Sequence, residues 1–328
     1  MLSTKNILSD IFNLPRGFEE TCLEVFRYQC TRTPIYRDFI AGLQIDPSKI
    51  TQINQIPFLP VEFFKTHEVI NEGLSANTVF TSSGTTNTRQ SKHPVANRTL
   101  YEESFRRCFQ LFYGAPSEYC ILALLPSYLE RAGSSLIYMV QDLIQRSGHP
   151  SGGFYLHNHD ELHAALIEQE ALSQKTLLLG VSYALLDFAE RQPMRLKHTL
   201  VMETGGMKGQ RKELVKEELH ACLSNRLGVD SIHSEYGMTE LLSQAYSKGN
   251  GIFRCPPWMK ILTRDTHDPL SLTVPGKSGG INVIDLANLY SCSFIATQDL
   301  GRVYPDGSFE ILGRFDHSDV RGCNLMIS

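Results

Sequence analysis

The chain has 328 residues, of which 42% are hydrophobic and 20% charged, a composition that is typical of globular proteins and excludes a disordered, coiled-coil or collagen-like chain. Its net charge is −4, from 31 Lys and Arg against 35 Asp and Glu, and because no long basic run is present, nucleic acid is not an expected partner. No stretch approaches the roughly 20 apolar residues of a membrane helix, the N-terminus has no secretory pattern, and the eight scattered cysteines form no Cys-x-x-Cys pair, so we expect a cytoplasmic protein.

Helices and strands are predicted to alternate over the first 250 residues. Apolar residues recur at helical spacing in the ranges 17–42, 100–113, 134–147 and 210–226. Apolar runs of strand length begin near Tyr119, Thr176 and His198, and each is followed by glycine or proline and then by a helical pattern. This alternation indicates an α/β protein with a mixed or parallel sheet that is covered by helices.

The pattern changes after about residue 250. Short alternating segments are separated there by turn sequences such as PGKSGG and YPDGS, which predicts a small antiparallel β subdomain. We therefore expect an α/β core over residues 1–250, a β-rich subdomain over 251–315 and a hinge-like tail over 316–328.

A loop rich in hydroxyl groups follows the apolar residues Val79 and Phe80. The loop consists of Thr81, Ser82, Ser83, Gly84, Thr85 and Thr86. Hydroxyl and backbone N–H groups donate hydrogen bonds to phosphate oxygens, and glycine lets the backbone approach a ligand closely. Taken alone, the segment fits an ordinary polar loop as well as a phosphate loop.

Three later motifs make the pattern specific. They are Tyr236-Gly237-Met238-Thr239-Glu240, Thr297-Gln298-Asp299-Leu300-Gly301 and Leu312-Gly313-Arg314-Phe315-Asp316. With the hydroxyl-rich loop, and in the same order, they resemble the phosphate loop, the aromatic-Gly-x-Thr-Glu motif, the Thr-Gly-Asp-Leu-Gly motif and the Gly-Arg-x-Asp hinge of the adenylate-forming superfamily, which includes acyl-CoA synthetases, luciferases and the adenylation domains of nonribosomal peptide synthetases. The resemblance implies the large N-terminal domain of that fold and the activation of a carboxylic acid as an acyl-adenylate by ATP.

The resemblance also implies roles for the residues around the phosphates. Ser82 to Thr86 would wrap the β- and γ-phosphates of ATP, with Thr81 at the start of the loop. Thr239 would contact the α-phosphate, and Glu240 would help to hold Mg²⁺, for which a carboxylate is a suitable ligand.

The nucleoside part of ATP has its own set of implied residues. Tyr236 would stack on adenine beside Gly237, and Gly205 and Gly206 would let the nucleotide lie against bare backbone. Asp299 would accept hydrogen bonds from both ribose hydroxyls, and Arg314 would contact the ribose or its phosphate edge.

Single residues of these motifs also have ordinary structural explanations. Tyr236 fits a core aromatic, Glu240 a charge at the N-terminus of a helix, and Asp299 a turn residue. It is the ordered set that favours function.

The sequence departs from common family members at two places. The loop continues after Thr86 without the usual Gly-x-Pro-Lys, which leaves open whether Arg89 or Lys92 supplies the positive charge. Longer members also continue after the hinge aspartate with a mobile domain that carries a lysine used in adenylation, whereas Ser328 ends this sequence, so we expect that mobile domain to be absent.

A short tail with a cysteine resembles the acyl-protein synthetase (LuxE-type) branch of the superfamily. Members of that branch activate a fatty acid as acyl-AMP and then take the acyl group onto their own cysteine near the C-terminus. Cys323 occupies such a place here, where Arg321 would favour the thiolate and Gly322 would allow the tail to move.

We therefore expect a ligase whose catalytic residues are Thr239, Glu240 and Cys323, with ATP and Mg²⁺ as cofactors. The acyl group would pass from Cys323 to an acceptor protein, such as a reductase or a carrier. Two alternatives stay open at this point: a ligase that acts on coenzyme A or a carrier-protein thiol, and a non-catalytic nucleotide- or acyl-binding subunit.

Overall fold

The chain forms two compact units that are interleaved along the sequence. A computed structural model describes residues 4–82, 89–125, 133–156, 158–205 and 214–315. The first unit comprises residues 1–77, 93–97 and 257–328, and the second comprises residues 78–92 and 98–256. The domains expected from the sequence, with boundaries at residues 250 and 315, are consecutive segments of the chain, and this division stays a prediction.

The first unit combines N-terminal helices with an antiparallel sheet. Its helices and 3₁₀ turns are α1 (Thr4–Asp10), α2 (Phe18–Arg32), α3 (Pro34–Gly42), η1 (Pro47–Lys49), η2 (Ile53–Gln55), α4 (Phe63–Thr66) and η4 (Leu286–Asn288). Its strands are β1 (Leu59–Pro60), β11 (Met259–Arg264), β12 (Ser278–Asp285), β13 (Phe294–Val303) and β14 (Phe309–Arg314). The antiparallel order β11-β12-β13-β14, with β1 parallel to β13, confirms the antiparallel β region predicted after residue 250.

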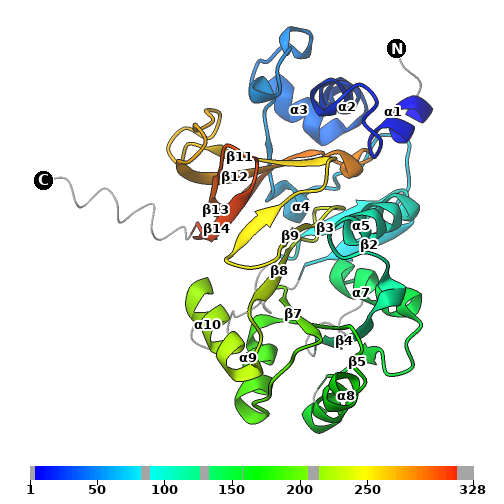
Figure 1. The fold of residues 1–328 in the computed structure, drawn as a ribbon. Helices are drawn as coiled ribbons and strands as arrows, with labels where there is room; N and C mark the ends of the chain where they lie inside the picture. The colour runs from blue at the N-terminus through cyan, green and yellow to red at the C-terminus, as the bar shows by residue number, and fades with distance from the viewer. Residues whose placement is uncertain (1–3, 83–88, 126–132, 157, 206–213, 316–328) are drawn as a thin grey trace, which may run out of the picture. The chain divides into compact units, whose positions relative to one another are not determined.

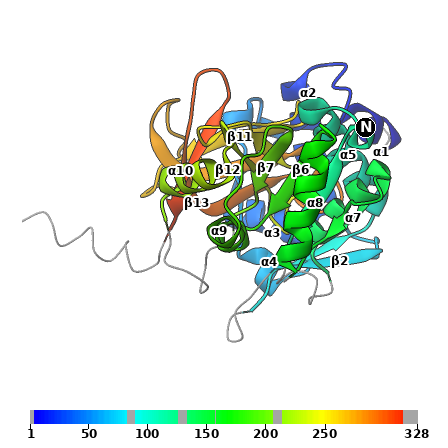
Figure 2. The same cartoon turned by 60° about the horizontal axis from the view of Figure 1, so that its bottom comes forward.

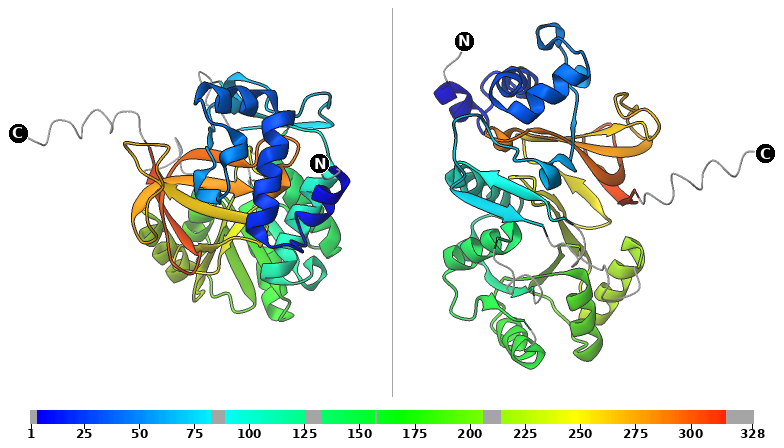
Figure 3. Two further views of the ribbon diagram at one scale, coloured as in Figure 1. Left: turned by 90° about the horizontal axis from the view of Figure 1, so that it is seen from above. Right: turned by 180° about the vertical axis from the view of Figure 1, so that it is seen from behind.

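Buried aromatic rings hold α2 and α3 on this sheet. Phe294 of β13 meets Phe26 of α2 edge-on and stacks on Tyr36 of α3, with 5.9 Å between the ring centroids in both pairs. All three rings are completely buried, and aromatic side chains bury more apolar area than other residues do. The two helices therefore cover one face of the strands, as Figure 3 shows.

The range 17–42, predicted as one helical pattern, is two helices. Helix α2 ends at Arg32 and α3 begins at Pro34, because proline has no N–H to continue a helix and disfavours helical backbone at the residue before it. Thr33 between them is extended, and its hydroxyl lies 2.7 Å from Asn71 Oδ1 and 2.9 Å from the Ser291 carbonyl oxygen. The break therefore fixes the direction in which α3 leaves α2.

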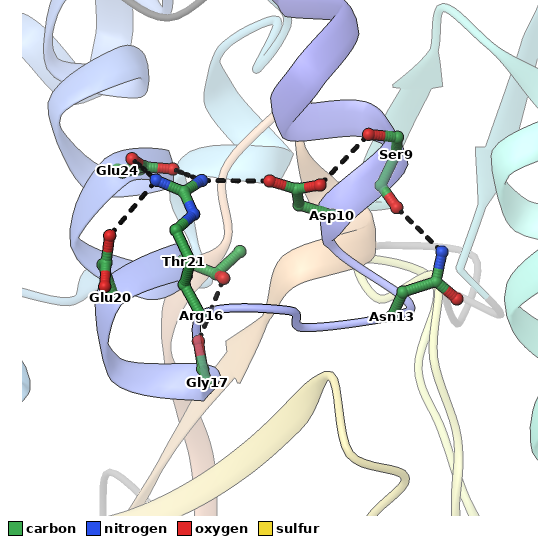
Figure 4. A network of polar contacts seen from close by, with 8 residues as sticks. All are labelled: Ser9, Asp10, Asn13, Arg16, Gly17, Glu20, Thr21 and Glu24. Atoms are coloured by element: carbon green, nitrogen blue, oxygen red, sulfur yellow. Dashed lines mark hydrogen bonds and ion pairs between the residues drawn. The ribbon is translucent and has the colours of Figure 1, made fainter.

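Arg16 joins α1 to α2 through three carboxylates (Figure 4). Its guanidinium group lies 3.0 Å from Asp10 Oδ2 and 3.2 Å from Glu20 Oε1, and it contacts both carboxylate oxygens of Glu24. Hydrogen bonds to Glu24 and Asp10 raise the pKa of Arg16 above its usual value, as expected for a guanidinium fork on carboxylates. The loop between the helices is thereby held by charge as well as by packing.

The second unit is built around a parallel sheet with helical crossovers. Its helices and 3₁₀ turn are α5 (Arg98–Tyr113), η3 (Pro116–Glu118), α7 (Ser135–Ser147), α8 (His159–Ala171), α9 (Ser182–Arg191) and α10 (Lys216–Leu227). Its strands are β2 (Thr78–Thr81), β4 (Cys120–Leu124), β5 (Gly153–Phe154), β6 (Thr176–Gly180), β7 (Thr199–Glu203), β8 (Ile232–Tyr236), β9 (Ala245–Ser247) and β10 (Ile252–Arg254), and β3 (Lys92–Val95) begins in it. The order β8-β7-β6-β4-β5 is parallel, and β8, β9 and β10 pair antiparallel.

The sequence patterns explain these elements. Strands β4 and β6 are buried at every position because a parallel sheet is covered by helices on both faces. Figure 1 shows α7 to α10 arranged around strands β4 to β8, and α9 and α10 pack against each other (Figure 2). The predicted strands near residues 119, 176 and 198 and the helical patterns over 100–113 and 134–147 are confirmed.

The boundaries of the helices follow their capping residues. The Ser134 side chain accepts a hydrogen bond from the Ile137 N–H at 3.3 Å and begins α7, while Gly148 and Gly228 end α7 and α10 in left-handed backbone with φ of 64° and 65°. In the described ranges, every helix is too short or too polar to cross a membrane.

Candidate functional site

Two residues that are predicted to bind the nucleotide lie at the carboxyl ends of neighbouring strands in the second unit. Strand β7 ends at Glu203, two residues before Gly205, and β8 ends at Tyr236, directly before Gly237. The two strands are parallel, with Glu203 opposite Ser234. Because open α/β sheets bind ligands beyond the carboxyl ends of their strands, the fold brings Gly205 and Tyr236 to the edge of the sheet where a ligand is expected.

A buried glutamate organises the turn at Gly205. Glu203 is 1% exposed, and its Oε2 accepts hydrogen bonds from the Gly205 N–H at 2.6 Å and from Ser182 Oγ at 3.0 Å. The Ser182 N–H, at the start of α9, donates to the Gly205 carbonyl oxygen at 2.9 Å. Gly205 has a φ of 75°, a left-handed conformation that glycine adopts most readily. Its predicted companion Gly206 lies outside the described residues.

Two residues of α10 face the other carboxylate oxygen of Glu203. Lys216 Nζ lies 3.1 Å from Oε1 as an ion pair without an aligned hydrogen bond, and His220 Nε2 lies 3.6 Å from the same oxygen. Burial acts to raise the pKa of Glu203, but the neighbouring His220, Lys216 and Ser234 and the Gly205 N–H outweigh it and hold that pKa well below its usual range. Glu203 is therefore ionised at neutral pH.

The pKa of a second carboxyl group, that of Glu235, is shifted in the opposite direction. The residue is partly exposed, yet burial of its carboxyl group and the charge of Glu203 raise its pKa to about 8, while Lys216 acts to lower it. A Cβ atom on Gly237 would lie 2.4 Å from Glu235 Oε1, so the absence of a side chain at Gly237 leaves room for this carboxyl. Paired carboxyl groups whose pKa values are pushed apart are typical of functional sites.

Tyr236 presents a partly exposed ring at the end of β8. The ring packs at 64° against Phe253 of β10, with 6.0 Å between the ring centroids. Lys216 also lies over the Phe253 ring, with its Nζ 4.6 Å from the ring centroid. The partial exposure disfavours the alternative of a core aromatic, and stacking on adenine stays a prediction.

Thr239 and Glu240 lie in the turn between β8 and β9. The Leu241 N–H donates to the Met238 carbonyl oxygen at 3.0 Å, and Glu240 is 5% exposed. Since antiparallel strand β9 follows this turn, Glu240 is not a charge at the N-terminus of a helix.

Mg²⁺ fits the chemistry at Glu240. Within the ranges that the structure describes, no group of three or more His, Cys, Asp or Glu is arranged so that it could hold a metal ion. Mg²⁺ usually keeps several water ligands and takes one or two carboxylates with the phosphates of a substrate. A single buried carboxylate such as Glu240 is therefore a suitable protein ligand, and the nucleotide would supply the others.

The hydroxyl-rich loop is tied together at its base. Ser82 follows β2, and its N–H donates to the Ser91 carbonyl oxygen at 3.1 Å, while the Ser91 N–H donates to Ser82 Oγ at 2.9 Å. Thr81 is held at the other side, because its N–H donates to the Gly133 carbonyl oxygen at 2.8 Å. The remaining predicted phosphate-binding residues lie outside the described ones: Ser83, Gly84, Thr85 and Thr86. Arg89 and Lys92 are both exposed, and the source of the positive charge stays open.

In the first unit, the two residues that are predicted to contact the ribose form an ion pair with each other. Asp299 of β13 is opposite Arg314 of β14, and Arg314 Nε lies 3.2 Å from Asp299 Oδ1. The Asp299 N–H donates to Thr297 Oγ1 at 3.1 Å, and Asp299 is 8% exposed. Asp299 therefore belongs to a strand and is not a turn residue. Carboxylates accept strong, charge-assisted hydrogen bonds from cationic and hydroxyl partners.

No family model and no curated protein matches this chain. The solved structure of ATP-bound MatB from Rhodopseudomonas palustris is 17% identical, with a TM-score of 0.54, over 72% of this chain and 47% of that chain. That of 2-hydroxyisobutyryl-CoA ligase in the postadenylation state, in complex with R3-HIB-AMP, is 12% identical, with a TM-score of 0.65, over 90% of this chain and 68% of that chain. The fold is that of the N-terminal domain of adenylate-forming enzymes.

The match confirms the predicted fold class. The chain spans about half the length of the MatB chain, which it covers to 47%. At these identities the similarity concerns the fold, and the roles of single residues stay predictions.

Gly301 of β13 has no room for a side chain. A Cβ atom there would lie 2.4 Å from the Glu310 carbonyl oxygen and 2.6 Å from Ile281 Cδ1. We expect Gly301→Ala to lower the free energy of unfolding by about 1 to 3 kcal/mol, because the backbone of β14 must shift. Urea unfolding measures the change. Gly42→Ala is the control, since nothing lies within 4 Å of the added atom and the variant should not lose stability. Equal stability of Gly301→Ala and the wild type would contradict the tight approach of β13 and β14.

Sequence reasoning missed the charged residues that support these motifs. In the first unit, Arg264 of β11 is 9% exposed and donates hydrogen bonds to the carbonyl oxygens of Ile281, at 2.7 Å, and Thr297, at 2.5 Å. It also donates to Asn282 Oδ1 at 2.9 Å. Arg264 therefore connects β11 with β12 and β13, and its hydrogen bond to β13 is made at Thr297, two residues before Asp299. In the second unit, Glu203, Lys216 and Glu235 were missed as well. Only the position of Glu203, at a strand end and two residues before a Gly-Gly pair, gave a signal that could have found it.

Proposed function

We propose that the chain is an ATP-dependent ligase that activates a carboxylic acid as an acyl-adenylate. The observation that carries the proposal is the position of Gly205 and Tyr236 at the ends of neighbouring parallel strands, on a fold shared with an ATP-bound protein and an acyl-AMP-bound ligase. The four motifs in their family order support it. In the reaction, a carboxylate oxygen of the acid attacks the α-phosphorus of ATP, the bond to the bridging oxygen breaks, and pyrophosphate leaves.

The residues around the phosphates would bind and orient ATP for this attack. The loop from Thr81 to Thr86 would donate hydrogen bonds to the β- and γ-phosphates, and Thr239 would contact the α-phosphate. Mg²⁺ held by Glu240 would offset the negative charge that develops on the phosphate oxygens. Orientation of this kind supplies much of the rate enhancement in reactions at phosphorus.

The residues around the nucleoside would set its position. The backbone at Gly205 and Gly206 and the ring of Tyr236 beside Gly237 would bind adenine. The carboxylate of Asp299, which lies beside Arg314, would accept hydrogen bonds from the ribose hydroxyls.

Our proposal includes a second step on Cys323, as in acyl-protein synthetases. The thiolate would attack the carbonyl carbon of a fatty acyl-adenylate, AMP would leave, and the thioester would pass its acyl group to a partner protein in the cytoplasm. Cys323 lies outside the described residues. Burial raises the pKa of four other thiols, to about 12 for Cys22, Cys30 and Cys292 and about 11 for Cys120. Since the thiolate is the nucleophile, these four are poor acceptors.

Exchange of radiolabelled pyrophosphate into ATP tests the first step. We expect exchange in the presence of Mg²⁺ and at least one member of a panel of carboxylic acids that includes fatty acids of increasing chain length. Absence of exchange with every acid would overturn adenylation.

The Cys323→Ser variant tests the second step. We expect it to keep pyrophosphate exchange and to lose the hydroxylamine-sensitive labelling by radioactive acid, because an oxygen ester resists hydroxylamine. Cys222→Ser is the matched control, as Cys222 is a partly exposed cysteine of α10 that has no role in the proposal. Labelling that survives in Cys323→Ser would move the acceptor elsewhere.

Coenzyme A is the second candidate acceptor. One specific observation favours it: the solved structure of 2-hydroxyisobutyryl-CoA ligase in complex with 2-HIB-AMP and CoA has a TM-score of 0.64, at 12% identity, over 91% of this chain and 70% of that one. Formation of acyl-CoA by Cys323→Ser at the wild-type rate would favour coenzyme A over the cysteine.

A further inference from the structure

Lys216 stands between a buried carboxylate and an aromatic ring. Its Nζ lies 3.1 Å from Glu203 Oε1 and 4.6 Å from the centroid of the Phe253 ring. A Cβ atom on Gly251 would meet Lys216 Cδ at 3.3 Å, so the stem of the lysine is also close to the backbone before β10. The side chain is 28% exposed, and its charge faces inward to Glu203.

Each partner of Lys216 supports one of the two segments to which we assign the nucleoside. Glu203 Oε2 accepts the hydrogen bond from the Gly205 N–H at 2.6 Å. Phe253 packs against Tyr236 with 6.0 Å between the ring centroids. One ion pair therefore connects the turn at the end of β7 with the ring at the end of β8.

Stability alone is a weak explanation for this pair. A buried ion pair often stabilises a fold no more than apolar side chains of the same size would, because both charges lose their water. The pair does hold two elements in one geometry, and binding sites depend on such support from residues that do not touch the ligand.

We propose that Glu203 and Lys216 form a positioning pair for the nucleotide, in which the carboxylate fixes the Gly205 turn and the ammonium group fixes the Phe253 ring against which Tyr236 packs. The proposal rests on the function proposed above. Neither residue is assigned a contact with ATP or with the reacting atoms.

Three variants test the pair: Glu203→Gln, Lys216→Met and the double variant. We expect each single substitution to raise the KM for ATP in pyrophosphate exchange about tenfold and to change kcat less than about twofold, because a mispositioned site loses binding that the ground state and the transition state share. The double variant should also raise KM about tenfold and not about a hundredfold, since both changes break one interaction. Lys216→Arg keeps a cation and should stay within about threefold of wild type.

The double variant keeps the test decisive if a single one fails to fold. It removes both charges, so no unpaired charge is left buried, and thermal unfolding should show recovered stability while KM for ATP stays raised. A pair that only stabilised the fold would recover both. Wild-type KM in the double variant would overturn the proposal, and so would wild-type KM in a folded Glu203→Gln. If Lys216→Met alone then raised KM, the result would point to direct binding of ATP by Lys216.

Lys175→Met is the matched control for Lys216→Met. Lys175 also lies between a carboxylate and a ring, with Nζ 2.9 Å from Glu118 Oε2 and 4.2 Å from the centroid of the Tyr119 ring, but it supports no segment assigned to the nucleotide. Its KM for ATP should equal that of wild type. If the wild type itself exchanges no pyrophosphate with any acid, the proposed function fails and the positioning pair fails with it; exchange with unchanged KM in the variants overturns the pair alone.

Discussion

The Glu240→Gln variant is expected to lose about 100-fold or more of the pyrophosphate exchange of wild type. Glutamine keeps the size of this buried side chain and removes the charge that would hold Mg²⁺. The metal ion supplies several kcal/mol of charge stabilisation in reactions of this kind, and about 1.4 kcal/mol corresponds to a factor of ten in rate. Exchange rates over a range of Mg²⁺ concentrations measure the effect, and high Mg²⁺ should restore part of the activity.

Two controls separate this loss from unfolding. Glu118→Gln removes a carboxylate that is half exposed and paired with Lys175 at the surface, where ion pairs contribute little, and it should keep full activity. Circular dichroism of Glu240→Gln should match that of wild type. A folded Glu240→Gln that exchanges pyrophosphate at the wild-type rate and Mg²⁺ requirement would exclude Glu240 as the metal ligand.

Regular elements with strong periodicity were predictable from the chain alone. The apolar runs of β4, β6 and β7 are buried strands because a parallel sheet is covered on both faces. The split of residues 17–42 at Pro34 required attention to one backbone N–H that proline lacks. The interleaving of the two units was not predictable in this way, because it depends on long-range contacts such as that of Leu59 in β1 with Ile295 in β13.

Residues of the candidate site were predictable only where they belong to a short sequence motif. Tyr236 and Gly205 stand in such motifs, and the parallel pairing of β7 and β8 explains why residues 31 positions apart reach one edge of the sheet. Glu203 and Lys216 carry no motif. Their contact joins a strand end to a helix across 13 positions, and a glutamate or a lysine there is equally compatible with a solvated surface.

The protein is expected to lose stability as the pH rises from about 6.5 to 8. Glu235 has a pKa of about 8 in the folded chain against an ordinary 4.5, chiefly because its carboxyl group is buried and faces the charge of Glu203. In this range the folded state holds a proton that the unfolded chain has already released, so unfolding releases a proton and a higher pH favours it. The stability that the protonated carboxyl contributes is fully present below about pH 4.5 and is lost as the pH rises through 8.

Other shifted groups act outside this window. Burial and the charge of Lys248 lower the pKa of His233 from 6.5 to about 4, so its contribution is complete above about pH 6.5 and is lost only as the pH falls toward 4. The pKa of Glu203 is lowered as well, and its contribution is lost only below its ordinary 4.5. Between pH 6.5 and 8, Glu235 should therefore dominate, and a full pH unit below its pKa corresponds to about 1.4 kcal/mol. The expected fall over the window is about 1.5 kcal/mol.

Glu235→Gln identifies the group, because it removes the titrating proton and keeps the size of the side chain. Urea unfolding between pH 6.5 and 8 should give a flat free energy of unfolding for this variant and a falling one for wild type. Glu217→Gln is the control, since Glu217 is an exposed glutamate in the first turn of α10, and it should keep the wild-type slope.

Glu203→Gln removes the charge that raises the pKa of Glu235, so the fall in stability should move to lower pH. An unchanged slope in Glu235→Gln would assign the proton to another group, whereas a flat slope there with a shifted fall in Glu203→Gln would establish that the two carboxyl groups titrate as a coupled pair.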